Sequence, residues 1–173
     1  MKWIGVAFLC AATSCAAEAV PSKTTATSIV APRTSVASYR TFSFGLAGQP
    51  KAGYEVTPRS LEVQRRLRPV VLEALLARGY VEDPEKPDLI VKLAAGTGAL
   101  ANRGAERAVP TGLARGFIGI DVYDAATGTE VWQGSAFAEI DPEKIDDSLL
   151  KTGVNHMLAE LPSRDTSDVA KMP

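Results

Sequence analysis

The stretch that most constrains the fold is residues 116–134, GFIGIDVYDAATGTEVWQG. Ile118, Ile120 and Val122 alternate with small or polar residues, and a second alternating series begins at Trp132 after a short break. A period of two residues is typical of β-strands whose two faces meet different surroundings. The stretch therefore predicts two neighbouring antiparallel strands whose apolar face needs cover from the rest of the chain.

The break between the two series has the composition of a tight turn. An Asp side chain such as that of Asp124 can accept a hydrogen bond from the backbone two residues further on. Gly128 can adopt the positive φ that closes a bulged hairpin loop. We therefore assign Asp124 and Gly128 structural roles.

Trp132 shares its parity with Gly134 and Ala136, which leave room for a large ring. Two interpretations follow: a core residue beneath the helices, or an exposed platform on which a ligand stacks. The small neighbours favour the core, so Trp132 is assigned a structural role.

Two amphipathic helices are predicted. The first begins after Thr57, a suitable N-cap, and ends at Gly79, which can take the left-handed conformation that stops a helix. Pro69 lies inside it and is expected to bend or divide it. The second is expected to start at the cap Asp141 and to continue to Leu161, with apolar residues at helical spacing.

Strands are also predicted at 38–44 and 88–95. The expected fold is an α+β two-layer sandwich of order β-α-β-β-β-α. It has about four mostly antiparallel strands and two helices on one face. The domain spans 38–162, between a disordered linker at 16–37 and a disordered tail at 163–173.

The N-terminus has the features of a secretion signal. Lys2 precedes an apolar run at 3–12, which is too short to span a bilayer. Residues 1–15 are therefore predicted to be a lipoprotein-type signal, with Cys15 as the lipid anchor. Ordinary secretory cleavage after Ala17 or Ala19 is the alternative.

Composition excludes several classes of function. The net charge of −1 gives no overall field for nucleic acid. Both cysteines, Cys10 and Cys15, precede the domain, which therefore has no disulfide or thiol chemistry. The chain contains one histidine, His156, and no nucleophile elbow accompanies it. We predict no catalytic residue, no metal site and no cofactor, with His156 bordering the apolar stripe of its helix and Asp121 solvated.

Two further stretches allow either a binding role or a purely structural interpretation. Arg59, Arg65, Arg66 and Arg68 make the first helix basic; a solvated face is favoured over a contact for anionic headgroups or an acidic partner. Residues 96–114 are rich in Gly and Ala, and a flexible hairpin tip is favoured over a binding loop.

The order of elements resembles a known family. A strand carrying TFSF is followed by a helix ending in LLARGY, a PDLIVKL strand, the hairpin, and a helix closing on LAELP. Over 38–162 this resembles the bacterial envelope lipoproteins of domain of unknown function 4136. The resemblance implies an antiparallel sheet with helices on one face and attachment to a bacterial envelope membrane. It implies no activity and no catalytic residue.

The expected function is that of a non-enzymatic cell-envelope lipoprotein whose domain binds a partner protein or another envelope component. The membrane contact would be the lipidated N-terminus, facing the periplasm, with the outer membrane favoured over the inner. A soluble periplasmic or secreted protein is the alternative location. A small periplasmic hydrolase or ligand-binding enzyme, and a structural spacer, are the alternative functions. A polar pocket joining His156 to Asp121 or Glu139 would indicate the enzyme.

Overall fold

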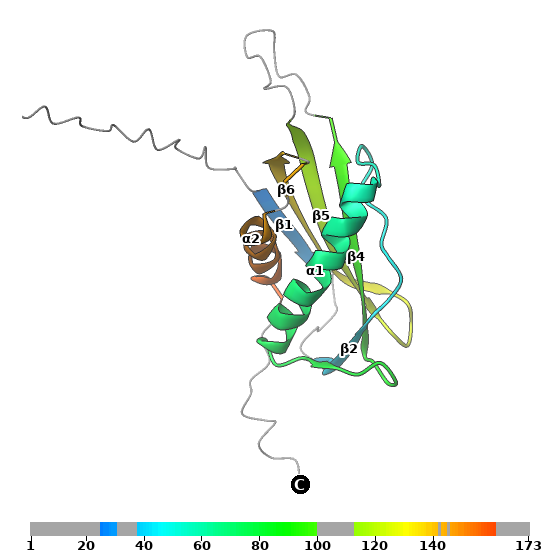
Figure 1. Ribbon diagram of the computed structural model, residues 1–173. Coiled ribbons are helices and arrows are strands. Elements are labelled where there is room, and N and C mark those ends of the chain that lie inside the picture. The colour runs from blue at the N-terminus through cyan, green and yellow to red at the C-terminus, as the bar shows by residue number, and fades with distance from the viewer. Residues whose placement is uncertain (1–24, 31–37, 100–112, 142, 145, 162–173) are drawn as a thin grey trace, which may run out of the picture.

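The computed structural model describes residues 25–30, 38–99, 113–141, 143–144 and 146–161. The predicted signal 1–15, its Cys15 and the predicted tail 163–173 lie outside these residues, as does most of the Gly/Ala-rich stretch. The described residues form one sheet and two helices, an α+β arrangement (Figure 1).

The sheet is mixed and has six strands in the order β1-β6-β5-β4-β2-β3. The strands and helices, in chain order, are β1 (Thr25–Val30), β2 (Thr41–Phe44), α1 (Pro58–Leu76), β3 (Val81–Glu82), β4 (Leu89–Gly98), β5 (Ala114–Asp124), β6 (Glu130–Ile140) and α2 (Asp147–Leu158).

The expectation of four mostly antiparallel strands is thus correct in class but wrong in detail. β4, β5, β6 and β1 pair antiparallel, whereas β2 pairs parallel to both β3 and β4. Helix α1 lies between β2 and β4 in the chain, and a helical crossover is the usual connection between parallel strands. The short β3 lies in the segment 80–87, for which only a polar connection was predicted.

β1 also corrects the predicted linker at 16–37, because six of its residues form an edge strand against β6. Its sequence, TATSIV, has no alternation of apolar and polar residues. Pairing through backbone hydrogen bonds depends little on side chains. The side-chain pattern of residues 25–30 therefore did not indicate a strand.

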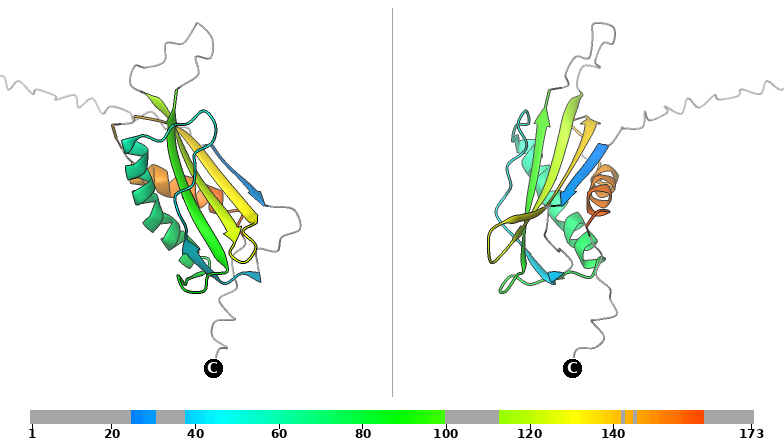
Figure 2. Two further views of the ribbon diagram at one scale, coloured as in Figure 1. Left: turned by 90° about the vertical axis from the view of Figure 1, so that its right-hand side faces the viewer. Right: turned by 180° about the vertical axis from the view of Figure 1, so that it is seen from behind.

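Both helices cover the same face of the sheet (Figures 1 and 2). The even-numbered positions of β5 and β6 face them and form the core with Leu67, Val71, Val154 and Met157 of the helices. Gly153 lets α2 approach closely: a Cβ added there would lie 3.1 Å from Cδ1 of Ile118.

Helix α1 begins with a capping box, in which the Thr57 hydroxyl accepts from the Ser60 N–H and the Ser60 hydroxyl accepts from the Thr57 N–H. It remains one assigned helix through Pro69, which is exposed. Gly79 has φ 83°, as a left-handed stop requires.

Helix α2 begins later than predicted. Its N-cap is Asp146, whose carboxylate accepts from the N–H groups of Ser148 and Leu149. Asp141, the predicted cap, instead accepts from the Glu143 N–H in the connection before the helix. Either aspartate has the chemistry of a cap, so the sequence did not distinguish them.

The hairpin turn has the predicted construction. The Asp124 carboxylate accepts from the N–H groups of Ala126 and Thr127, and Gly128 has φ 69°. Trp132 is fully buried and lies against Gly134, where an added Cβ would come within 2.4 Å of the indole ring.

The face of the sheet away from the helices is partly covered by residues 45–55. Tyr54 packs on Phe117 and Phe137, with ring centroids 5.2 and 5.7 Å away. Lys51 reaches over to β6 and donates to the Ser135 hydroxyl at 2.9 Å. This segment explains why side chains on the second face are shielded from water.

Candidate functional site

A cleft of about 260 Å³ opens at one end of the sandwich, where α1 and α2 begin. Its sheet wall is the end of β4, the start of β5 and the end of β6, and its helix walls are the first turns of α1 and the first two turns of α2. Figure 1 shows the end of β4, the start of β5 and the end of β6 together at one end of the sheet, with α1 beginning beside β4.

The interior of the cleft is mainly apolar. The aliphatic side chains that line it are Val63, Ala95, Ile118, Ala136, Ala138, Ile140, Leu149 and Leu150. Gly116 and Gly153 also line it, each packed closely against a neighbouring isoleucine. An apolar cleft with few polar groups is the usual form of a small-ligand site.

Charged residues of both signs surround the mouth: Arg59, Glu139, Asp141, Lys144 and Asp146. The carboxylate of Asp146 has a pKa below its usual value because it accepts from the Ser148 side chain and from backbone N–H groups. Lys144 and Asp141 form an ion pair with a separation of 3.5 Å.

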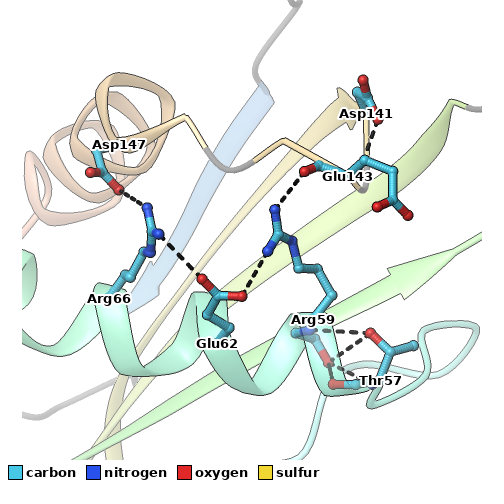
Figure 3. A network of polar contacts seen from close by, with 8 residues as sticks. Thr57, Arg59, Glu62, Arg66, Asp141, Glu143 and Asp147 are labelled. Atoms are coloured by element: carbon cyan, nitrogen blue, oxygen red, sulfur yellow. Dashed lines mark hydrogen bonds and ion pairs between the residues drawn. The ribbon is translucent and has the colours of Figure 1, made fainter.

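Arg59 ties α1 to the connection before α2 (Figure 3). Its guanidinium contacts the Glu62 carboxylate at 2.7 Å and donates to the Glu143 carbonyl at 2.6 Å. The hydrogen bond from Arg59 is the main reason that the pKa of Glu62 is lowered. Arg66 continues the network by contacting both Glu62 and Asp147.

Three of the four arginines that make α1 basic have ion-pair partners within this chain. Arg59, Arg66 and Arg68 are each within ion-pair distance of a carboxylate of this chain. Exposed ion pairs stabilise little. Arg59 and Arg66 link α1 to the connection before α2 and to its first residue, whereas Arg68 contacts Glu82 of β3.

Ser60 is the serine that lines the cleft. Ser60 is 2% exposed, and its hydroxyl already donates to the Thr57 carbonyl and accepts from the Thr57 N–H. A nucleophilic serine needs a neighbouring base that takes its proton, and this hydroxyl is committed to the helix cap.

From the sequence, Asp121 and Glu139 were possible partners of His156, and the structure does not bring these three residues together. It lies on the exposed side of α2 and does not line the cleft. Asp121 belongs to the other face of the sheet, with the Gln133 amide donating to its carboxylate at 3.1 Å. Glu139 is exposed at the cleft mouth. The arrangement that would have indicated an enzyme is not formed by these three residues.

The expectation that Asp121 is solvated is wrong. It is half-buried beneath residues 45–55, where a Cβ added to Gly48 would lie 3.5 Å from its carboxylate oxygen. Burial raises the pKa of Asp121, although Gln133, Lys51 and Lys92 act in the opposite direction. The sequence showed the position on the second face, but not the segment that covers it.

Lys51 and Ser135 are a pair that the sequence did not predict. A lysine beside a serine can act as its base, but Ser135 is only 2% exposed. The lysine is more than 80 residues away in the chain, which is why no motif joined the two. The contact holds residues 45–55 against the sheet.

Asp121→Asn is expected to raise the melting temperature at pH 7. The amide oxygen still accepts from Gln133, and the cost of a buried charge is removed. A raised folded-state pKa means that the wild-type carboxyl favours folding most below its unfolded pKa of about 3.9, and loses this contribution as the pH rises through the folded pKa. The gain should therefore be present at pH 7 and vanish near pH 3.

Calorimetry of both chains over this pH range measures the effect. A gain of about 2–4 °C corresponds to about 1 kcal/mol for a chain of this size. A lower melting temperature for the Asn variant at pH 7 would mean that attraction from Lys51 and Lys92 outweighs the cost of burial.

Within the described ranges, no three His, Cys, Asp or Glu side chains are grouped closely enough to hold a metal ion. Neither of the described helices is both long and apolar enough to cross a membrane.

Comparison with known families gives one match, to the domain of unknown function DUF4136, over residues 28–163. The chain belongs to this family. The match begins inside β1, which supports including that strand in the DUF4136 domain. No curated protein matches the chain.

Solved structures share the fold of this DUF4136 domain at low sequence identity. A PelC dodecamer from Paraburkholderia phytofirmans is 13% identical with a TM-score of 0.53, and the match covers 83% of this chain and all of that one. A PDZ domain protein from Parabacteroides distasonis is 15% identical with a TM-score of 0.56, covering 83% of this chain and 37% of that one. These likenesses concern the fold alone.

The cleft itself was missed at the level of sequence. Its lining comes from five segments spread over 95 positions, from Arg59 to Gly153. The one available signal was an excess of small residues at the ends of the strands, such as Ala95, Gly96 and Gly116. Ala95 and Gly116 were predicted in strands and Gly96 in a flexible hairpin tip, and none of them was connected with a cleft.

Proposed function

We propose that this chain is a non-enzymatic cell-envelope lipoprotein whose DUF4136 domain binds an apolar group of another envelope component in the cleft. The single observation that carries this proposal is the apolar cleft with a charged rim at the start of both helices. Filling such a cleft removes apolar surface of both partners from water, which is the main favourable term in association.

Two features of the cleft support binding in preference to hydrolysis. Its interior side chains are aliphatic, and the hydroxyl of Ser60 is already occupied. The cleft also differs from a packed core in being open to solvent. A structural spacer would have no need of an open apolar cleft.

The test uses N-phenyl-1-naphthylamine, an apolar dye whose fluorescence rises on leaving water. The Cys15→Ala chain, purified from the soluble fraction without detergent, is expected to bind it. Val63→Trp should fill the cleft from α1 and weaken dye binding about tenfold or more, a change of about 1.4 kcal/mol.

Leu61→Trp is the matched control. Leu61 is on the same helix, is 49% exposed and does not line the cleft, so dye binding should be unchanged. Ala138→Phe fills the cleft from the sheet wall and guards against a folding defect peculiar to Val63→Trp. Equal dye binding by all four chains would remove the cleft as the site.

A further inference from the structure

The first described strand, β1, begins beside the cleft, and the segment before it would be the tether to a lipidated Cys15. In the register of β1 with β6, Thr25 lies opposite Phe137, which lines the cleft, and Val30 lies opposite Trp132, further along the sheet. β1 therefore runs away from the cleft, and the chain before Thr25 departs from the cleft end. Figure 2 shows β1 beside α2 along the same end of the sheet.

The length of chain before β1 limits how far the cleft can lie from an anchor at Cys15. Ten residue steps separate Cys15 from Thr25, with nine residues between them. Fully extended, they span at most about 33–36 Å. On the proposed function, with Cys15 lipidated, the cleft end of the domain is thus held near the bilayer surface.

Much of the sheet backbone that lines the cleft is already paired within the sheet, although residues 138–140 extend past the end of β1. Ala95 and Gly96 pair with β5, Gly116 and Ile118 pair with β6 as well, and the end of β6 pairs with β1 up to Phe137. A peptide entering the cleft would bring N–H and C=O groups that need partners. An acyl chain brings none, so the lining suits an acyl chain better.

The rim suits a headgroup that carries both charges. Arg59 and Lys144 are cationic, while Glu139, Asp141 and Asp146 are anionic, all around one mouth. Because Arg59 pairs with Glu62, Lys144 pairs with Asp141, and Asp146 accepts from backbone N–H groups, the rim favours neither an anionic nor a cationic headgroup. A zwitterionic headgroup, whose phosphate and ammonium cancel in net charge, suits such a rim best. Both groups then stay in water while the apolar chain is buried.

We infer that the cleft takes one acyl chain of a zwitterionic phospholipid from the membrane to which the domain is tethered. The inference rests on the proposed function, because it names the envelope component. Binding would draw the cleft end of the domain onto the bilayer surface, with the opposite end of the sandwich, near the β5–β6 turn, facing away.

The experiment uses vesicles of phosphatidylcholine that contain a small share of a phosphatidylcholine with a diazirine in one acyl chain. After irradiation with the soluble Cys15→Ala chain, crosslinks are mapped by mass spectrometry. We expect them on cleft residues, such as Val63, Ile118 and Leu149. Val63→Trp should reduce them about tenfold, in line with the loss of dye affinity, and Leu61→Trp should leave them unchanged.

A parallel arm replaces the vesicles with a diazirine-bearing free fatty acid. Labelling of the cleft by the fatty acid but not by vesicles would overturn the phospholipid as the source. Dye binding in the cleft without labelling by either lipid would overturn the acyl chain while the proposed function stands. Absence of dye binding as well would overturn both.

Discussion

Trp132→Ala is expected to lower the free energy of unfolding by about 3–5 kcal/mol, the usual cost of truncating a fully buried large aromatic side chain. Trp132 is 0% exposed and is the largest side chain in the core. Its indole ring lies against Gly134, and Met157 of α2 is close to the same glycine. Truncation would leave a cavity between the sheet and α2, and rigid strands can close it only in part.

Trp132→Phe is the informative control. The indole N–H is buried without a hydrogen-bond partner among the described residues. Phenylalanine removes this unsatisfied donor while keeping most of the ring, so its cost should be well below that of alanine. Unfolding in urea is followed by circular dichroism in all three chains. Tryptophan fluorescence would not serve, because both variants lack Trp132 and the only other tryptophan, Trp3, lies in the predicted signal.

An unchanged unfolding free energy for Trp132→Ala would contradict the packing described here. It would also reopen the interpretation of Trp132 as a platform for ligands.

Cys15→Ala is expected to move the protein from the membrane fraction to the soluble fraction. Under the lipoprotein interpretation, Cys15 carries the acyl chains, and each buried CH₂ contributes about 0.8 kcal/mol to membrane binding. Loss of the chains should therefore change the partition by far more than tenfold. Fractionation of cells followed by immunoblotting measures it.

Cys10→Ala is the matched control, because Cys10 lies within the apolar run of the predicted signal. This variant should remain in the membrane fraction. If the wild-type chain is already soluble, cleavage after Ala17 or Ala19 becomes the better interpretation, and the protein is a free periplasmic or secreted one. If Cys15→Ala stays membrane-bound, Cys15 is not the anchor.

The fold class followed from local patterns that the tertiary structure preserved. Alternation in the hairpin, the Thr57 cap and the Gly79 stop each depend on residues within one turn or one strand pair. Their outcomes are seen in the φ values of Gly79 and Gly128 and in the hydrogen bonds to Asp124. The family resemblance relied on the same segments and is confirmed.

The errors concern pairings between segments distant in the chain. β1 has no side-chain pattern of its own and exists through its register with β6, more than 100 residues later. Asp121 was expected in water because its strand alternates, but residues 45–55 cross that face. In both cases the partner segment, not the residue itself, determines the environment.

By itself, the sequence determined the class of the fold, the hairpin with its Asp124–Gly128 turn, and the burial of Trp132, because each depends on short-range periodicity and steric preference. Only the tertiary structure decided that the sheet is mixed, that residues 25–30 of the predicted linker form a strand, and that five segments enclose an apolar cleft where this strand begins. Those features arise from contacts across the chain, whose geometry no local pattern encodes.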